Sequence, residues 1–485
     1  MTTTDELDGR PDAHLMRVAA VLVLGVLAPL LDTTIVNVAL RTLGADLHAT
    51  VSAVQWVSTG YLLAMATAIP VSGWATERHG ARRMWLLALT LFLAGSAACG
   101  LAWNLGSLIA FRAVQGAGTG LLLPIMQTVL FRAAGGRPAA RTLALISLPV
   151  VIGPILGPVL GGLLVDVHWR WIFYVNAPVC LVAIALARRV LPVDDARPGT
   201  GRLDVTGLLL LSPGLAGLVY GLSRAGGAGG FAQAGVLVPL AGGLLLAVAF
   251  GAHALRRPGT ALVDLRLFAD RWFATCSAVL FLAGLSMFAA MLLLPLYYQQ
   301  VRGEGVVAAG LLLAPQGLGT ALARLAVGLV DRLTDRTVIL AGIALTALGT
   351  WPFALADAHT ALLPLALALV VRGLGLGVVM MAVMLSAYAG LTREQIPHAS
   401  SLTRIVQQLG GSFGTALLAV VLQRRLAGAA GAAGVAAGFG HTFTWALALT
   451  VLALVPALAI PRGSSRAARP GPTAPDSARQ APTAR

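Results

Sequence analysis

Long apolar segments separated by short polar ones recur along the whole chain. Each is long enough to cross about 30 Å of hydrocarbon as an α-helix, which takes about 20 predominantly apolar residues. The pattern predicts fourteen membrane-spanning helices, at 15–38, 53–73, 84–103, 106–130, 141–165, 172–190, 204–223, 232–255, 272–297, 306–330, 337–356, 361–388, 398–423 and 441–461. We therefore expect an all-α polytopic membrane protein.

The composition excludes the main soluble classes of protein. Of the 485 residues, 58% are hydrophobic and only 11% are charged, whereas a soluble domain carries about 25% charged residues. The three cysteines lie in apolar segments without metal-ligand spacing, so neither a metal site nor a disulfide framework is expected. Glycine runs inside the spans follow no strand, so no dinucleotide cofactor is expected either.

Every basic residue counted in the net charge is arginine. The Lys+Arg total of 34, against 19 acidic residues, gives a formal charge of +15, and the sequence contains no lysine. A Walker A loop needs a lysine to reach the nucleotide phosphates, so we expect no ATP and an ion gradient as the energy source. The arginines lie between apolar segments rather than on a soluble basic face, which argues against nucleic acid as a partner.

The positions of the arginines predict the orientation of the chain, because cytoplasmic loops carry an excess of positive charge. With a cytoplasmic N-terminus, the inner segments, to which Arg404 is assigned, hold roughly four times as many arginines as the outer ones. The outer arginines are Arg41, Arg170, Arg224, Arg302, Arg424 and Arg425. Both termini of a multi-pass plasma-membrane protein are therefore expected in the cytoplasm.

An internal repeat relates the two ends of the chain. The acid–arginine pairs Glu77-Arg78 and Asp335-Arg336 follow the second and tenth spans, and Arg372 precedes alternating glycines as an arginine of the fourth span does. Repeated halves are typical of secondary transporters. The expected organisation, a major facilitator fold, is a cytoplasmic N-terminus (1–14), a six-helix bundle (15–190), two inserted spanning helices (204–255), a second six-helix bundle (272–461) and a disordered cytoplasmic tail (462–485).

One acidic residue, Asp32, lies clearly inside a span. At 1.5 Å per residue it is about 12 Å from the outer end of its helix, and Arg112 is about 9 Å from the same side in the fourth span. A carboxylate in hydrocarbon is costly without a cation, so we expect the two to pair. A movable arginine would make Asp32 a proton site, and a solvated carboxylate at a frayed helix end is the alternative.

Glycines spaced four residues apart lie on one face of the fifth span. Such a strip allows close helix packing, and the prolines within it bend the helix. A bending, closely packed helix suits a transporter that rocks, and tight packing alone is the alternative. The strip comprises Gly153, Pro154, Gly157, Pro158, Gly161 and Gly162.

The loop after the second span is a candidate cytoplasmic gate. Its arginines either hold the two bundles together or signal topology alone, and the sequence leaves both interpretations open. Together with its repeat, the candidate gate comprises Gly73, Glu77, Arg78, Gly80, Arg83, Asp335 and Arg336.

Polar and flexible side chains inside the spans are candidates for the wall of a substrate cavity, because methionine adapts to varied apolar molecules. Simple packing against lipid or neighbouring helices is the alternative for the methionines and the aromatic residue. The candidates are Asn37, Gln115, Tyr297, Arg372, Met380, Met384, Gln407 and Gln408.

Four of these segments resemble motifs of the fourteen-helix drug:proton antiporter family of the major facilitator superfamily (EmrB/QacA type). The resemblance covers about 15–461. The segments are 32–39 in the first span, R-x-x-Q-G-x-G from Arg112, the glycine strip at 153–162, and the junction at 169–178. The loop after the second span departs from the family pattern, because Glu77 replaces a usual Asp and Ala81 a usual Arg.

The resemblance implies alternating access, in which a small amphiphilic substrate leaves the cell or inner leaflet while a proton enters. In the family, the residues at Asp32 and Arg112 couple protonation to transport, and the strip in the fifth span distinguishes exporters from importers. The implied function is proton-coupled export of drugs or hydrophobic metabolites across a lipid bilayer, and no enzyme activity is expected. A membrane-embedded enzyme or lipid-handling protein on the same scaffold, and a solute importer, stay open as alternatives.

Overall fold

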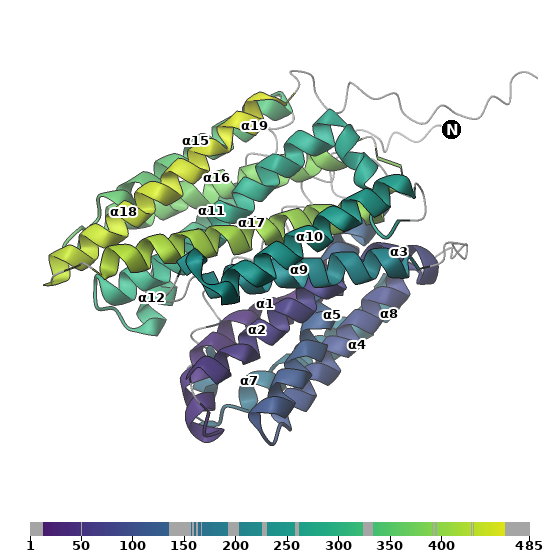
Figure 1. Ribbon diagram of the computed structural model, residues 1–485, viewed down its shortest axis with the longest axis horizontal. Helices are drawn as coiled ribbons and strands as arrows, with labels where there is room; N and C mark the ends of the chain where they lie inside the picture. Colours follow the sequence, from purple (N-terminus) through teal and green to yellow (C-terminus); the bar gives the residue numbers. More distant parts are fainter. Residues whose placement is uncertain are drawn as a thin grey trace, which may run out of the picture.

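The structure is a computed structural model, drawn as a ribbon in Figure 1. It describes residues 13–49, 51–134, 157, 160–161, 163–165, 167–192, 203–225, 230–257, 261–323, 333–389, 391–392, 395–427, 429 and 431–460. All the regular elements among these residues are helices.

The helices of the first 190 residues pack against one another in the lower part of Figure 1, where they are coloured purple to blue. We call them the first half. They are α1 (Ala13–Asp46), α2 (Val51–Ala68), α3 (Val71–His79), α4 (Ala81–Gly100), α5 (Leu105–Ala134), α7 (Trp171–Tyr174) and α8 (Asn176–Val190). The predicted span 53–73 is divided between α2 and α3 next to Pro70, which has no N–H with which to continue a helix.

The helices after residue 270 form the second half. They are α11 (Arg271–Gln300), α12 (Val306–Leu312), α13 (Ala314–Leu322), α15 (Asp335–Ala354), α16 (Leu362–Tyr388), α17 (Gln395–Leu426), α18 (Gly431–Leu452) and α19 (Leu454–Leu458). Their packing repeats that of the first half: α13 and α15 flank α16 as α2 and α4 flank α5, and α11 packs on α18 as α1 packs on α8.

The described residues include eleven helices that are long and apolar enough to cross a membrane. The all-helical, polytopic class expected from the sequence is thereby confirmed. The number fourteen stays a prediction, because most of 141–165 and the end of 306–330 lie outside the described residues. The same holds for the terminal segments 1–12 and 461–485.

Glycines set the distance between helices and also reveal the register of the repeat. A Cβ on Gly116 of α5 would collide with the carbonyl oxygen of Tyr61 on α2, and a Cβ on Gly373 of α16 with that of Gln316 on α13. These two glycines therefore occupy equivalent places. Since Arg372 immediately precedes the second of them, it corresponds in position to Gln115 rather than to Arg112.

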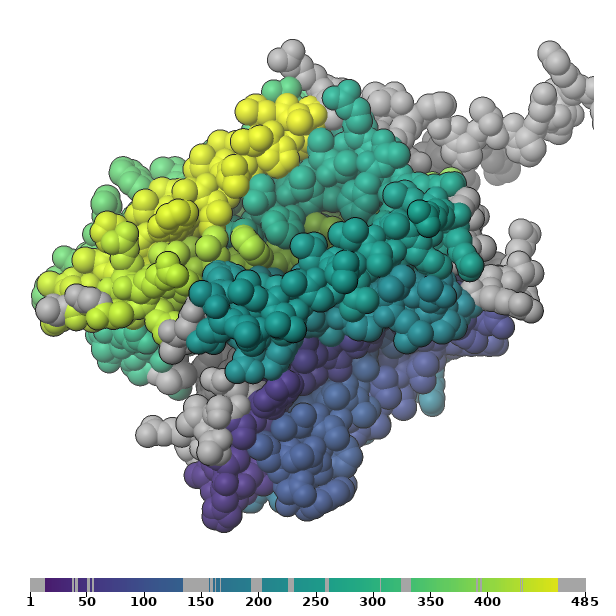
Figure 2. All heavy atoms as spheres, viewed as in Figure 1, coloured from purple at the N-terminus to yellow at the C-terminus, as the bar shows by residue number. Residues whose placement is uncertain are grey.

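Two further helices, α9 (Val205–Ala225) and α10 (Ala234–Arg256), form a hairpin that packs on both halves through α9, which contacts α2 and α17. In Figure 2 this teal pair lies across the junction between the purple and the green and yellow parts. The short 3-10 helices η2 (Gly230–Ala232) and η3 (Leu265–Ala269) lie before α10 and before α11.

Asp204 fixes the base of this hairpin. It precedes α9 and accepts the N–H of Gly207 at 2.8 Å, as an N-cap residue does. The His253 ring of α10 lies 2.9 Å from the same carboxylate, and the N–H of Leu262 donates to it at 3.2 Å. One side chain thus joins α9, α10 and the segment that leads to α11.

Candidate functional site

Asp32 and Arg112 form an ion pair inside the first half. Arg112 Nη1 of α5 lies 2.5 Å from Asp32 Oδ2 of α1, and the exposed fractions of the two side chains are only 1% and 0%. A charge inside a spanning helix is costly unless it is paired, which accounts for this contact. We call these two residues the charge pair.

Three other polar side chains complete the surroundings of Asp32. Gln115 Nε2 and Asn176 Nδ2 donate to its Oδ1 atom at 3.0 and 3.1 Å. Asn176 Nδ2 also lies 3.0 Å from Ser96 Oγ, and Gln115 Oε1 accepts from Arg112 Nη1 at 2.7 Å. The result is one buried polar cluster to which α1, α4, α5 and α8 each contribute.

Helix α2 holds the other side of the arginine. Arg112 Nε donates to the carbonyl oxygen of Val57 at 3.2 Å, and its guanidinium lies 4.1 Å from the centre of the Tyr61 ring, a cation–π contact. The Tyr61 hydroxyl donates to Thr119 Oγ1 at 2.9 Å. The guanidinium is therefore held by a carboxylate, an amide, a carbonyl and an aromatic face.

This arrangement can exchange an ion pair for a proton. Protonation of Asp32 removes the negative charge that holds the guanidinium of Arg112, which then favours other partners. Because the charge pair is sealed from solvent, the helices that carry it must move before a proton can enter or leave. Among the described residues no cluster of His, Cys, Asp and Glu could hold a metal ion.

One glycine of the strip in the fifth span, Gly157, packs on the helix that carries Asp32. Gly157 and Gly161 are described and buried, and a Cβ on Gly157 would collide with Thr34 Oγ1 of α1. The glycine therefore permits an approach that a larger residue would prevent. The remaining residues of the strip lie outside the described residues: Gly153, Pro154, Pro158 and Gly162.

The two halves meet at one end of the molecule, where α3 and α5 contact α17. Ser72 Oγ lies 3.0 Å from Ser401 Oγ, and Thr128 Oγ1 lies 3.0 Å from Ser400 Oγ. A Cβ on Gly73 would lie 3.2 Å from Ser401 Oγ, so a side chain there would crowd this contact. We call this the closed end.

Charged and aromatic side chains add to the closed end. Glu77 Oε1 of α3 lies 3.3 Å from His398 Nε2 of α17. Tyr388 of α16 donates to Gln127 Oε1 at 3.3 Å, and its ring stacks on Phe131 of α5 with 4.0 Å between ring centres. Two of the predicted gate residues, Gly73 and Glu77, therefore contact the opposite half.

The other predicted gate residues lie on α3 and α4 beside the closed end, or in the second-half copy of the motif. Gly80 forms the turn between α3 and α4 with a φ of 88°, a conformation that favours glycine. The Arg78 guanidinium lies 5.9 Å from the centre of a tryptophan ring in its own helix, and Arg83 is exposed. Asp335 and Arg336 are the first residues of α15, where an acid suits the helix dipole.

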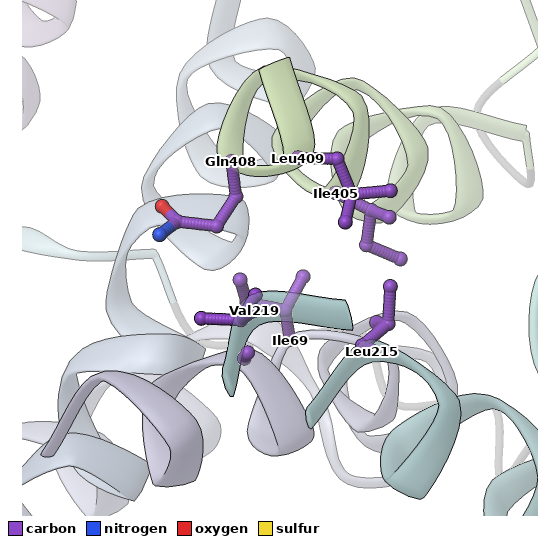
Figure 3. A pocket seen from close by; sticks show the side chains of 7 residues that line it. Ile69, Leu215, Val219, Ile405, Gln408 and Leu409 are labelled. Carbon is purple, nitrogen blue, oxygen red and sulfur yellow. The ribbon is translucent and has the colours of Figure 1, made fainter. Parts of the chain in front are cut away.

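Among the predicted cavity residues, the structure brings together those of α16 and α17. Gln407 Nε2 lies 3.7 Å from Met380 Sδ. Gln408 lines a small apolar hollow between α17, α2 and α9, shown in Figure 3. Met384 is buried in the core of the second half. The other residues that line the hollow are Ala66, Ile69, Leu215, Val219, Ile405 and Leu409.

The remaining predicted cavity residues lie elsewhere. Gln115 belongs to the cluster around Asp32, as described above. Tyr297 is packed against Phe353 and Phe443, and its hydroxyl donates to the carbonyl oxygen of Asp357 at 2.8 Å. Asn37 belongs to α1, but its side chain lies outside what the structure describes.

Arg372 is buried in the second half among neutral groups. Its Nη1 atom donates to Gln316 Oε1 at 2.8 Å, its Nη2 atom to the carbonyl oxygen of Ser286 at 3.0 Å, and its Nε atom to Thr350 Oγ1 at 3.2 Å. Helix α11, the counterpart of α1, has no acidic residue. The charge pair of the first half thus has no copy among the described residues of the second.

Sequence reasoning did not select Asn176, Ser96 or Tyr61 as site residues, although all three are buried beside the charge pair. The sequence does contain an indication for Asn176, because this residue lies in the segment 169–178 that resembles a family motif. Ser96 and Tyr61 had none, since a serine or tyrosine in an apolar span is common.

A polytopic helical protein with a sealed carboxylate–arginine pair in one half, and two halves that meet at one end, has the architecture of a secondary transporter. The family model of the Major Facilitator Superfamily matches residues 22–415 of this chain. The chain therefore belongs to this superfamily, and the similar proteins identify its branch as the EmrB/QacA type.

Three of these relatives cover most of the chain. The multidrug resistance protein B homolog of Mycobacterium tuberculosis is 42% identical over 420 residues, which are 85% of this chain and 77% of the relative. The cephamycin export protein CmcT of Amycolatopsis lactamdurans is 34% identical, over 88% of this chain and 90% of its own. The multidrug export protein EmrB of Escherichia coli is 30% identical, over 85% and 81%.

Solved structures show the same fold at low sequence identity. The proton:xylose symporter XylE superposes with a TM-score of 0.62 at 14% identity, over 94% of this chain and 97% of its own. The human organic anion transporter TETRAN gives a TM-score of 0.58 at 16% identity, over 91% and 100%.

Proposed function

We propose that this protein is a proton-coupled exporter of drugs or other amphiphilic small molecules that works by alternating access. The single observation that carries the proposal is the sealed charge pair, in which we expect protonation of Asp32 to release Arg112. The names of the relatives in Mycobacterium tuberculosis, Escherichia coli and Amycolatopsis lactamdurans, all resistance or export proteins, support the direction of transport.

The finer organisation belongs to the same proposal. The chain crosses the plasma membrane fourteen times, as a six-helix bundle (15–190), two inserted helices (204–255) and a second bundle (272–461). Both termini and the closed end face the cytoplasm, in accord with the excess of arginine in the inner segments. The partners are the exported amphiphile, protons and the bilayer, without ATP.

The residues have distinct roles in this mechanism. The charge pair takes up and releases the proton, and Gln115 and Asn176 position its carboxylate. The glycine strip at 153–162 lets the fifth span slide on α1. The contacts of the closed end, including Gly73 and Glu77, seal the cytoplasmic side while the site is open to the exterior.

The test is an Asp32→Asn variant reconstituted in proteoliposomes. Asparagine has a similar shape but cannot carry a proton, so a pH gradient should no longer drive transport of a fluorescent dye. We expect the gradient-driven rate to fall at least a hundredfold, while the variant still inserts and binds the dye. Asp46→Asn is the matched control, because Asp46 is near the end of the same helix and accepts from the Trp169 indole at 2.6 Å.

Three outcomes would contradict the proposal. Undiminished gradient-driven transport by Asp32→Asn would remove Asp32 from the mechanism. Net uptake of the dye along the proton gradient would indicate an importer. Chemical turnover of a lipid or dye by the purified protein in the absence of any gradient would indicate a membrane-embedded enzyme.

A further inference from the structure

Arg404 lies inside the molecule, although the sequence pattern assigned it to a cytoplasmic segment. It is nine residues beyond the first residue of α17, Gln395, which is about 13 Å along the helix at 1.5 Å per residue. Its side chain is partly buried rather than exposed at the helix end. A topology signal does not explain an arginine at this depth.

The face of α17 that carries Arg404 points toward the first half. One turn earlier, Ser400 and Ser401 contact α5 and α3 at the closed end. Residues three or four apart share a helix face, so Arg404 and Gln408 continue the same stripe away from the closed end. Figure 3 shows Gln408 at the edge of the hollow, opposite Val219 of α9.

Both side chains have hydrogen-bonding atoms that nothing in the described part of the chain satisfies. Arg404 Nη1 donates to Gln407 Oε1 at 2.7 Å, but its Nε atom is enclosed without an acceptor. Gln408 Oε1 is likewise enclosed without a donor. No described carboxylate pairs with Arg404. A buried charge without a counter-ion is unfavourable, so this place favours an anion.

The charge of the interior strengthens this preference. The positive charge of Arg112 is balanced by Asp32, whereas Arg372 has only neutral partners. Arg404 therefore adds to an interior that carries more positive than negative charge among the described residues, which attracts anions and repels cations.

We propose that Arg404 and Gln408 bind the anionic group of the exported amphiphile, and that the apolar side chains around Gln408 contact the adjoining part of its body. The Gln408 amide can turn its N–H groups toward an anion, because the oxygen and nitrogen ends of the amide exchange by rotation. The inference rests on the proposed export function and adds its substrate class, which is organic monoanions such as carboxylates.

The test is equilibrium binding to the purified full chain in phosphatidylcholine nanodiscs, at fixed pH and without a gradient. The probes are three fluorescent molecules with one body and different charges: pyrenebutyrate, its neutral amide and the corresponding amine. We expect the wild type to bind the carboxylate at least tenfold more tightly than the amide, and the amine most weakly. Preference for the amine, or equal binding of all three, would overturn the proposal without any variant.

Variants then assign the preference to Arg404. We expect Arg404→Gln to lose about tenfold in affinity for the carboxylate, the order of one charged hydrogen bond, and to bind the amide unchanged. Unchanged binding of the amide also reports that the variant is folded. Arg404→Lys should keep most of the preference. Arg424→Gln is the matched control, because Arg424 is exposed near the other end of the same helix.

Two further comparisons separate related outcomes. An equal loss of affinity for all three probes in Arg404→Gln would overturn the proposal. Repeating the titration with phosphatidylglycerol in the nanodiscs tests whether a lipid headgroup occupies the site. If the affinity of the carboxylate probe stays the same, the site binds a free amphiphile. If it falls, the headgroup competes at Arg404. Failure of Asp32→Asn to affect gradient-driven export would instead refute the proposed function, while the charge preference would still be read from binding.

Discussion

Each oxygen of the Asp32 carboxylate has its own set of donors. Oδ2 accepts from Arg112, and Oδ1 accepts from the amides of Gln115 and Asn176. The carboxylate is therefore fully hydrogen-bonded without water, which a buried charge requires. In the proposed mechanism, these amides keep the carboxylate in place when the guanidinium moves away.

The surroundings of Asp204 predict how the thermal stability of the protein depends on pH. Burial raises the pKa of this carboxyl, but the N–H groups of Gly207 and Leu262 and the His253 ring outweigh it, so the pKa lies below its ordinary value. Because the pKa of Asp204 is lower in the folded protein than in the unfolded chain, where it is about 3.9, the ionised carboxylate stabilises the fold above that pH. This stabilisation is lost as the pH falls through the folded-state pKa.

We therefore expect Asp204→Asn to melt at a lower temperature than the wild type at pH 7, and the difference to shrink below about pH 4. Thermal unfolding of the detergent-solubilised proteins between pH 3 and pH 7 measures it. Asp264→Asn is a suitable control, because Asp264 also accepts a local N–H, that of Arg266 at 3.0 Å, but outside the hairpin base. A difference that grows toward low pH would contradict the assignment.

At the scale of the helix, glycine determines how closely α2 and α5 approach. Because the backbones meet at Gly116, the Val57 carbonyl can reach Arg112 Nε and the Tyr61 ring can cover its guanidinium. The position of the charge pair is therefore a consequence of helix packing as well as of charge. In the second half the equivalent contact, at Gly373, positions an arginine among neutral groups instead.

A methyl group at this contact should disturb both packing and transport. We expect Gly116→Ala to destabilise the protein by about 1–3 kcal/mol, because a Cβ would collide with the Tyr61 carbonyl oxygen and force α2 and α5 apart. Thermal unfolding and gradient-driven dye transport measure the two effects.

Gly242→Ala is the matched control, since a Cβ there meets nothing within 4 Å and alanine favours the helix. It should be neutral or slightly stabilising. Equal effects of the two substitutions would show that helix propensity, and not the approach of α2 to α5, decides the outcome.

At the scale of the whole molecule, the closed end provides a direct test of alternating access. Ser72 and Ser401 belong to opposite halves, with 3.0 Å between their hydroxyl oxygens. A cysteine at each position should form a disulfide under oxidising conditions and hold the halves together. We expect transport by Ser72→Cys/Ser401→Cys to fall to background on oxidation and to return with a reductant.

Each single-cysteine variant serves as a control, because the described native cysteines are buried and should not pair with it. Undiminished transport by the oxidised double variant, with the cross-link shown by mass spectrometry, would mean that the closed end does not open during the cycle.

Much of this architecture follows from the sequence, because apolar length and the arginine distribution are properties of single segments. The pairing of Asp32 with Arg112 could be expected for the same reason, since each is costly alone in a span. The donors Ser96 and Asn176 could not, because they depend on which helices adjoin α1. Arg404 was counted among the cytoplasmic arginines although the predicted span 398–423 contains it, because charge alone does not fix how deep a residue lies. Arg372 was likened to Arg112 although packing aligns it with Gln115.

The hydroxyl contacts of the closed end have a consequence for the energy of the cycle. A neutral hydrogen bond contributes about 0.5–1.5 kcal/mol, so the Ser72–Ser401 and Thr128–Ser400 contacts together resist opening by only a few kcal/mol. One elementary charge that crosses 100 mV releases about 2.3 kcal/mol, nearly a fiftyfold change in an equilibrium constant. The energy of one proton crossing the membrane is therefore of the same order as these two hydroxyl contacts together.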